Sequence, residues 1–301
     1  MISTIERPAP VVVRMNNWRN IGFFAFTTLG ALVGVPVYLS RHGFVPGDWI
    51  LFGVYVIATG MSITAGYHRL YAHRAWKAHP VVGFLALFFG AAAFEQAALD
   101  WATQHRDHHK YVDTPEDPYS IKRGFFYAHM GWLLFYDQPL DYGNVKDLKD
   151  QPMVAHQKRY YLLWCLASGI FLPLAIGAAY GSVWGALWIG ICLRIFVVHH
   201  STFFINSVCH TFGTSTYDPD ATARDHWLVA ILTNGEGYHN FHHRFPSDYR
   251  NGVRWYHWDP TKWLIASLAA LGLARDLKKT PDPIISEVRL QADTIRARRR
   301  G

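Results

Sequence analysis

Four long apolar stretches constrain this chain more than any other feature of its sequence. They cover residues 21–39, 49–66, 161–180 and 183–198. A helix needs roughly 20 apolar residues to cross a bilayer, because its backbone polar groups must be satisfied internally there. The chain is 50% hydrophobic and 17% charged, whereas soluble domains have about 25% charged residues. The sequence therefore predicts an all-α integral membrane protein with four transmembrane helices.

A fifth apolar stretch, residues 81–99, contains Glu95 and Gln96. We predict that it is re-entrant or interfacial, and the alternative is an ordinary fifth span. The fourth stretch is short and contains Arg194. A charge at that depth needs polar partners from neighbouring segments, or a side chain that reaches the interface.

The basic residues predict the orientation. With four spans, 27 of the 29 Lys and Arg residues fall on one side of the membrane: three in residues 1–20, eleven in 67–159 and thirteen in 199–301. Basic residues are enriched on the cytoplasmic side. We therefore expect a multi-pass protein with both termini in the cytoplasm. The short N-terminal segment and the lack of a fused electron-carrier domain favour a bacterial inner membrane.

The same division predicts the domain organisation. Residues 1–20 form a cytoplasmic N-terminal segment, residues 21–280 one domain, and residues 281–301 a basic C-terminal tail. Within the domain, residues 67–159 and 199–280 form a cytoplasmic helical cap, in which residues 263–274 are expected to make an interfacial helix. The tail is expected to be a solvated, disordered end, with attraction to anionic lipid as the alternative. The positive charge shows no contiguous surface for nucleic acid, and the three cysteines show no disulfide pattern.

Nine of the 17 histidines gather in four short motifs on the predicted cytoplasmic side. The motifs are HRLYAH (68–73), HRDHH (105–109), NSVCH (206–210) and HNFHH (239–243). The nine candidate metal ligands are His68, His73, His105, His108, His109, His210, His239, His242 and His243. Asn206 lies four residues before His210, so it shares a helix face with that histidine.

The spacing gives these motifs a physical meaning. Residues at i, i+3 and i+4 share a helix face, so each H-x-x-H-H triplet presents three imidazoles to the same side. His68 and His73 are five residues apart, which does not align them on an ideal α-helix. We therefore expect that the helix ends or bends there, or that these two histidines serve different metals. Nine imidazoles are too many for one ion, and they predict a di-metal site of four or five ligands each.

The residues alone leave the metal open. Neutral imidazole binds Zn, Cu, Fe and Ni, whereas a structural zinc site usually includes cysteine. The sequence is also compatible with a metal-binding membrane protein or transporter. That alternative requires ionisable residues inside the spans, where this chain has Arg194, and the clustered histidines lie outside them.

The motifs HRLYAHR, HRDHHKY, NSVCH and GEGYHNFHH resemble the histidine boxes of the membrane fatty acid desaturases. The chain is most similar to the delta-9 acyl-CoA and acyl-lipid branch, which includes the stearoyl-CoA desaturases. Asp117-Pro118 and residues 122–132 and 245–250 also fit this branch, and the resemblance extends over roughly residues 20–280.

The resemblance implies four membrane helices and a cytoplasmic cap that holds two iron ions (Fe²⁺/Fe³⁺) with the nine histidines. It implies that Asn206 contacts one metal, that Trp101 and Thr202 line a bent acyl tunnel, and that Val56 and Gly60 limit chain length at its closed end. It also implies O₂-dependent insertion of a cis double bond into a saturated acyl chain. Acidic side chains that accept hydrogen bonds from the outer ring nitrogens should orient the imidazoles, and the candidates are Asp113, Asp225 and Glu236.

Breaking an unactivated C–H bond requires a metal–oxygen oxidant, and the chain has no G-x-G-x-x-G nucleotide motif. We therefore expect an external electron donor such as a ferredoxin, a rubredoxin, or a b-type cytochrome with its reductase. A lipid hydroxylase or acetylenase on the same scaffold is the enzymatic alternative.

The sequence differs from the acyl-CoA members of the family at the residues that bind the CoA headgroup. Those members carry Arg-Asp before the second box and Arg-Lys after a Gly-Trp-Leu-Leu stretch, where this chain has Thr103-Gln104 and Tyr136-Asp137. Charge-assisted contacts to phosphate are the strong ones. The acyl group is therefore expected to be carried by a phospholipid, by an acyl carrier protein, or by CoA held through other residues such as Lys122 and Arg123.

Overall fold

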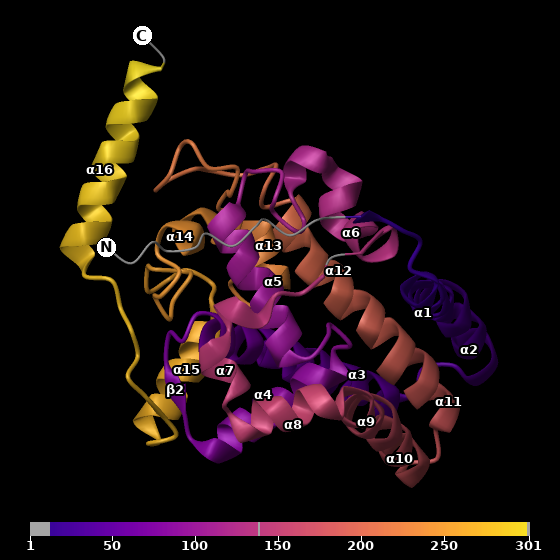
Figure 1. The fold of residues 1–301 in the computed structure, drawn as a ribbon. Helices are drawn as coiled ribbons and strands as arrows, with labels where there is room; N and C mark the ends of the chain where they lie inside the picture. Colours follow the sequence, from indigo (N-terminus) through magenta and orange to yellow (C-terminus); the bar gives the residue numbers. More distant parts are fainter. Residues whose placement is uncertain (1–12, 138, 300–301) are drawn as a thin grey trace.

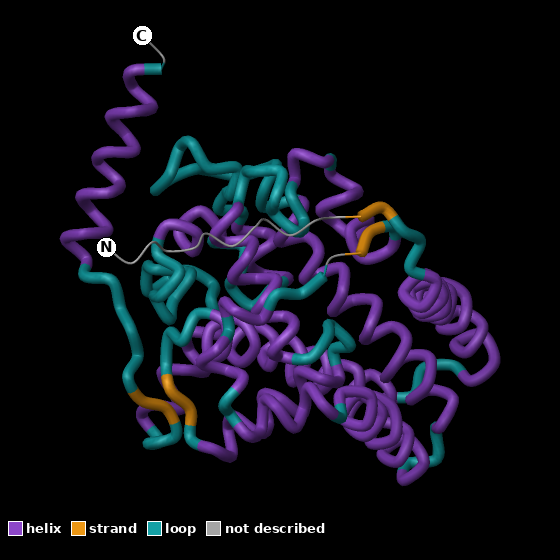
Figure 2. The backbone as a smooth tube through the Cα atoms, viewed as in Figure 1, coloured by secondary structure: helices purple, strands orange, loops and turns teal. Residues whose placement is uncertain are grey.

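The computed structural model describes residues 13–137 and 139–299, and helices dominate this part of the chain (Figures 1 and 2). Four helices in it are long and apolar enough to cross a membrane: Trp18–His42, Pro46–Ala72, Tyr161–Ala179 and Val183–Ser207. The prediction of an all-α chain with four membrane-length helices is confirmed. The second and fourth helices run six and nine residues beyond their predicted apolar ends, because each continues into a histidine-bearing segment.

Each long helix contains a π-helical segment. The first consists of α1 (Trp18–Leu29), η1 (Gly30–Gly34) and α2 (Val35–His42). The second consists of α3 (Pro46–Met61) and η2 (Ser62–Ala72), and the third of α9 (Tyr161–Leu166), η6 (Ala167–Phe171) and α10 (Leu172–Ala179). The fourth consists of α11 (Val183–Gly185), η7 (Ala186–Leu193) and α12 (Arg194–Ser207).

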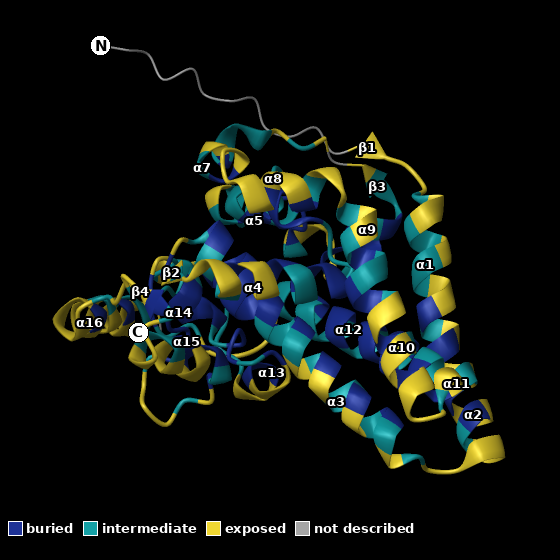
Figure 3. Cartoon of the chain, turned by 90° about the horizontal axis from the view of Figure 1, so that it is seen from below, coloured by how far each residue is buried: buried dark blue, intermediate teal, exposed yellow. Residues whose placement is uncertain are grey.

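Small residues let the first and fourth helices approach closely. A Cβ atom at Gly30 would lie 2.7 Å from Sγ of Cys192, and one at Gly34 would lie 2.5 Å from the Trp188 ring. Such contacts are typical of membrane helices, in which close packing replaces the hydrophobic effect as the driving force. The apolar side chains on the outer faces of these helices are exposed in the isolated chain (Figure 3), as expected for surfaces that contact lipid.

The fifth apolar stretch forms α4 (Pro80–Ala92), whose 13 residues are too few to span a bilayer. Its last carbonyl accepts a hydrogen bond from the buried Arg194, which also donates to the Gly169 carbonyl at 3.0 Å. Neighbouring backbone groups therefore provide the polar partners that Arg194 needs inside the fourth helix.

The other helices come from residues 98–159 and 227–298. They are α5 (Ala98–Tyr111), η3 (Ile121–Arg123), η4 (Tyr127–Gly131), α6 (Trp132–Leu134), η5 (Tyr142–Asn144), α7 (Lys146–Lys149), α8 (Pro152–Arg159), α13 (Trp227–Leu232), α14 (His239–Arg244), α15 (Pro260–Ala270) and α16 (Asp282–Arg298). In Figure 1, α5, α13 and α14 lie together beside the ends of α3 and α12. This arrangement brings the histidine motifs to one end of the helix bundle.

Two short antiparallel pairings tie distant segments together. β1 (Val13–Arg14) pairs with β3 (Tyr136–Asp137), with Val13 opposite Asp137. β2 (Lys77–Ala78) pairs with β4 (Ala274–Arg275), with Lys77 opposite Arg275.

The C-terminal tail differs from the expected disordered end. Residues 282–298 form α16, which buries Ile285 beside Tyr217 and Phe241. This helix was not predicted, because the run of terminal arginines favours a solvated end and the apolar residues that precede it are few. Residues 1–12 of the predicted N-terminal segment and residues 300–301 of the tail lie outside the described residues.

Candidate metal centre

His68 and His73 lie together at the end of the second long helix. Residues 62–72 form the π-helix η2, in which backbone hydrogen bonds join residues five apart. The amide of His73 donates to the His68 carbonyl at 3.0 Å, and the two ring centroids are 4.7 Å apart. The π-helix thus aligns a spacing that an α-helix would separate. The alternative that these two histidines serve different metals is not supported by this arrangement.

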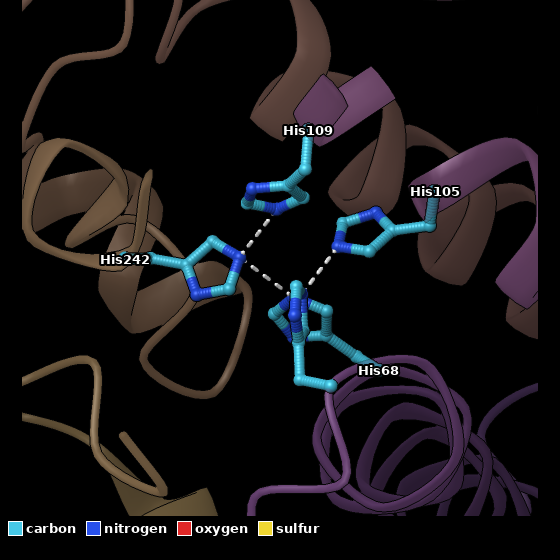
Figure 4. Close-up of side chains that lie close together, drawn as sticks. His68, His105, His109 and His242 are labelled. Atoms are coloured by element: carbon cyan, nitrogen blue, oxygen red, sulfur yellow. Dashed lines mark hydrogen bonds between the residues drawn. The ribbon is translucent and has the colours of Figure 1, made fainter. Parts of the chain in front are cut away.

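The structure brings all nine boxed histidines into two adjoining clusters. The first cluster consists of His68, His73, His105, His109 and His242, and the second of His108, His210, His239 and His243. Within each cluster the potential ligand atoms all lie within 4.8 Å of one another, so each could hold a metal ion. Figure 4 shows four rings of the first cluster directed toward a common centre.

The two H-x-x-H-H helices divide their histidines between the clusters. On α5, His105 and His109 belong to the first cluster and His108 to the second. On α14, His239 and His243 belong to the second cluster and His242 to the first. Residues at i+3 and i+4 differ by about 100° around a helix axis. Each helix therefore gives its i, i+4 pair to one cluster and its i+3 residue to the other, instead of presenting all three to one metal.

Buried carboxylates contact the outer nitrogens of two ligands. Glu236 Oε2 lies 2.8 Å from Nδ1 of His68, and Asp117 Oδ1 lies 2.9 Å from Nδ1 of His108. Such contacts fix the proton on Nδ1 and leave the Nε2 lone pair free to bind a metal. Asp117 is absent from the candidates predicted from sequence. The Asp-Pro pair at 117–118, which fits the desaturase branch, was the available signal, and it lies in the loop 112–120 that follows α5.

The other two predicted acids act at a greater distance. Asp113 accepts a hydrogen bond at 2.8 Å from the backbone amide of Thr222, whose hydroxyl lies 2.7 Å from Nδ1 of His210. Asp225 accepts bonds from the backbone amides of Asn240 and Phe241, at 2.9 and 3.1 Å. Asp225 therefore caps the first turn of α14 rather than touching an imidazole.

A buried ion network supports Glu236. The Arg69 guanidinium donates to Glu236 Oε1 at 2.8 Å and to both carboxylate oxygens of Asp259, at 3.0 and 3.1 Å. Asp259 also caps the first turn of α15 through the amide of Lys262. The arginine beside Glu236 lowers the pKa of that carboxyl against its burial, so the carboxylate remains ionised beside His68.

Burial keeps seven of the cluster imidazoles neutral. It lowers the pKa of His73, His105 and His109 well below the usual value, and neighbouring imidazoles add to the effect. The same holds for His210, His239, His242 and His243. Neutral imidazole is the form that binds metals.

The geometry within the clusters fits bound cations. Nε2 of His242 lies 3.0 Å from Nε2 of His68 and 2.9 Å from Nε2 of His109, and similar contacts recur in the second cluster. Neighbouring ligands at a metal–nitrogen distance of about 2.1 Å would lie about 3 Å apart in an octahedral shell. The Nε2 lone pair of His68 is directed at Nε2 of His242, and that of His108 at Nε2 of His243. A cation bound within each cluster would remove the repulsion between the facing nitrogens.

A cavity begins at these clusters and runs along the second and fourth helices. Its wall includes His68, His105, His108 and His239, together with Trp101, Thr202, Val56, Gly60 and Asn206. All five of these non-histidine candidates from the sequence therefore line one cavity. Asn206 lies on α12, which also carries Thr202 one turn earlier.

Several polar groups in this wall were not predicted as site residues, and Glu95 is the acidic one among them. Glu95 follows α4 and accepts a hydrogen bond at 2.8 Å from the Thr202 hydroxyl. Burial raises the pKa of Glu95 to about 7. The cavity wall thus carries less negative charge near neutral pH than an ordinary carboxylate would give it.

Two of the four positions that depart from the acyl-CoA pattern lie beside the cavity, whereas Tyr136 and Asp137 form β3. Gln104 lines the cavity and Thr103 is buried. Lys122 and Arg123 are exposed, and they donate to the backbone carbonyls of Asp113 and Pro115.

A membrane-length helix bundle with two all-histidine clusters beside an elongated cavity defines a class of integral membrane metalloproteins. Residues 47–276 match the fatty acid desaturase family. The chain is 40% identical to acyl-CoA desaturase 1 of Saccharomyces cerevisiae over 93% of its own length and 56% of the relative. It is 37% identical to human stearoyl-CoA desaturase (91% and 77% covered), and 36% identical to the delta(9)-fatty-acid desaturase fat-5 of Caenorhabditis elegans (89% and 82% covered).

The chain therefore belongs to the fatty acid desaturase family, and the resemblance noted in the sequence is confirmed. It spans just over half the length of the two yeast relatives, which are covered to 56% and 57%.

Proposed function

We propose that this protein is an O₂-dependent fatty acyl desaturase that inserts a cis double bond, at the delta-9 position, into a saturated long-chain acyl group. The observation that carries the proposal is the pair of histidine clusters at one end of the cavity. Membership of the family and the names of the relatives support it.

We assign the nine histidines as ligands of two iron ions and Asn206 as a further contact to the second. With O₂ as co-substrate, two iron ions held there would supply the oxidant that unactivated C–H bonds require. Glu236 and Asp117 hold protons on Nδ1 of His68 and His108, so that both rings keep their metal-binding nitrogens directed inward. Thr222, held by Asp113, does the same for His210.

The cavity wall positions the acyl chain. Trp101 stacks on His105 with ring centroids 4.7 Å apart, so the wall beside the first cluster is rigid and apolar. Thr202, which donates to Glu95, faces the same cavity from α12. A bound chain held against these residues would present one pair of methylene groups to the clusters and exclude water from them. Val56 and Gly60 would then set how many carbons extend beyond that point.

The electron balance requires a donor. Converting –CH₂–CH₂– to –CH=CH– releases two electrons and two protons, whereas reducing O₂ to two water molecules consumes four of each. The remaining two electrons must come from an external carrier such as a ferredoxin, a rubredoxin or a b-type cytochrome, and the two protons from solvent.

The proposed orientation places the clusters and both termini in the cytoplasm of a bacterial cell. The cap would rest on the membrane through α13 and α15, whose exposed side chains include Trp227, Leu228, Trp263 and Leu264. Aromatic and apolar side chains gathered in this way favour the interface. The acyl headgroup in this proposal is a phospholipid, a carrier protein, or CoA held by Lys122 and Arg123.

The test is the fatty-acid profile of cells that lack their own desaturase and express this chain, measured by gas chromatography–mass spectrometry with double-bond location. We expect a new cis monoene with the parent chain and with His156→Ala, whose histidine is exposed on α8 outside both clusters. We expect none with His108→Ala. A product that gains an oxygen instead of losing two hydrogens would show a hydroxylase, and no product from a folded, iron-loaded parent would refute the proposal.

A further inference from the structure

The cluster histidines are not equally buried. Six are buried, whereas His73, His109 and His243 are half-buried. These three rings are in contact, with centroids 4.6 Å apart for His73 and His109 and 4.3 Å apart for His109 and His243. They therefore form one continuous edge through which the two clusters approach solvent, and we call it the outer edge.

The outer edge also joins the two clusters. His109 belongs to the first cluster and His243 to the second, and their rings stack with an interplanar angle of 20°. Other ring pairs between the clusters are farther apart, as with His239 and His242 at 5.7 Å. The stacked pair of His109 and His243 is thus the closest ring contact between the clusters in the described residues. An electron that reaches this pair has a short path to both clusters.

An exposed basic residue directly follows each histidine of the outer edge. These residues are Arg74, Lys110 and Arg244. The Arg74 side chain is 63% exposed and lies 3.6 Å from Asp147, and Lys110 donates to the neighbouring Tyr111 hydroxyl. Consecutive Cα atoms are about 3.8 Å apart, so the backbone of each basic residue lies beside the edge.

We propose that the outer edge is where electrons enter, and that Lys110 and Arg244, with Arg74, dock a one-electron carrier protein with an acidic face. This inference rests on the proposed function, which requires two electrons from outside the chain for each double bond. Two carrier molecules would be oxidised in succession, and solvent would supply the two protons that complete two water molecules. Opposite charges on the two proteins would raise the rate of encounter and select the orientation in which the carrier faces the stacked rings.

The experiment measures binding separately from turnover. The protein is loaded with zinc, which is redox-inert, and titrated with two acidic probes, a plant-type [2Fe–2S] ferredoxin and the soluble domain of a b-type cytochrome. The variants are Lys110→Glu/Arg244→Glu and the control Arg14→Glu/Arg19→Glu. The control makes the same change of net charge at exposed positions in β1 and the first turn of α1, and Figure 1 shows α1 on the opposite side of the molecule from α14.

We expect at least one probe to bind the parent and the control equally, and to bind Lys110→Glu/Arg244→Glu more than tenfold more weakly at low salt. The difference should shrink as salt screens the charges. Equal affinity of all three proteins, or no binding of either probe to the parent, would overturn the docking proposal.

A dithionite-driven single turnover of the iron-loaded parent separates this outcome from the proposed function. Product formed by a parent that binds neither probe would refute the docking site and leave the desaturase intact. Binding of a probe by a parent that forms no monoene would refute the desaturase and leave the docking site.

Discussion

Gly60 offers the sharpest perturbation of the cavity. It lies eight residues before His68, and Val56 lies twelve before it, roughly 18 Å along the helix axis from that histidine. Both residues line the cavity. A Cβ atom at Gly60 would meet the Asn234 amide nitrogen at 2.8 Å, at the flexible end of that side chain. The space beyond Gly60 is therefore shared between the cavity and Asn234.

Replacing Gly60 by leucine should shorten the acyl chain that the enzyme prefers. The four added carbons would displace about two methylene groups of a bound chain, and each buried methylene contributes about 0.8 kcal/mol. A loss of about 1.6 kcal/mol corresponds to roughly a 15-fold shift in the ratio of kcat/KM for stearoyl over palmitoyl substrates. The assay is competition between the two saturated substrates, read from the two monoene products.

Gly53→Leu is the matched control. It lies on the same helix, and an added Cβ atom there meets nothing within 4 Å. Val56→Ala removes two carbons from the wall and should shift the ratio in the opposite direction. If Gly60→Leu leaves the ratio unchanged, or if Gly53→Leu shifts it equally, Gly60 does not limit chain length and the reasoning is refuted.

Three further predictions follow from the groups around the histidines. Glu236→Gln should weaken iron binding about 10- to 100-fold and destabilise the metal-free protein by about 3 kcal/mol, because it removes the anion beside both His68 and the buried Arg69. Metal titration measures the first effect and thermal unfolding the second. Unchanged values for both would contradict the role assigned to Glu236. Asp117→Asn should weaken iron binding by a similar factor at the second cluster while leaving the first loaded, and metal analysis after partial chelation would show equal loss from both clusters if this is wrong. Burial raises the pKa of Asp225 from 3.8 to about 7, so the folded chain retains a proton that the unfolded chain releases. The stabilisation of the folded state by this proton is full below pH 3.8 and is lost as the pH rises through about 7. Asp225→Asn, which keeps an oxygen to cap α14, should therefore change the unfolding temperature little at low pH and raise it above pH 7, and a constant difference across that range would count against the buried carboxyl.

Much of this fold could be predicted because the bilayer imposes strong rules on sequence. The four spans follow from apolar length, and the non-spanning character of α4 follows from its 13 residues and the polar Glu95 and Gln96 beyond it. The C-terminal helix α16 was missed because tertiary contacts, as between Ile285 and the side chains of Tyr217 and Phe241, decide its order. A window of sequence at the end of a chain does not contain those contacts.

The nine candidate ligands could be named from sequence, but their division between clusters could not. That division depends on the 100° between His108 and His109 on α5 and on the π-helix that aligns His68 with His73. The carboxylate at His108 was missed for a related reason. Asp117 lies nine residues away in a loop, and loop geometry rather than helical periodicity brings it to the ring.

The central claim is that the two clusters hold two iron ions, and counting them tests it most directly. Purified protein from iron-supplemented cells should contain about two iron atoms per chain, since each cluster offers a complete imidazole site. His105→Ala/His109→Ala and His210→Ala/His239→Ala should each retain about one, because each pair belongs to a single cluster. A parent with a single ion that both double variants lose would contradict the account.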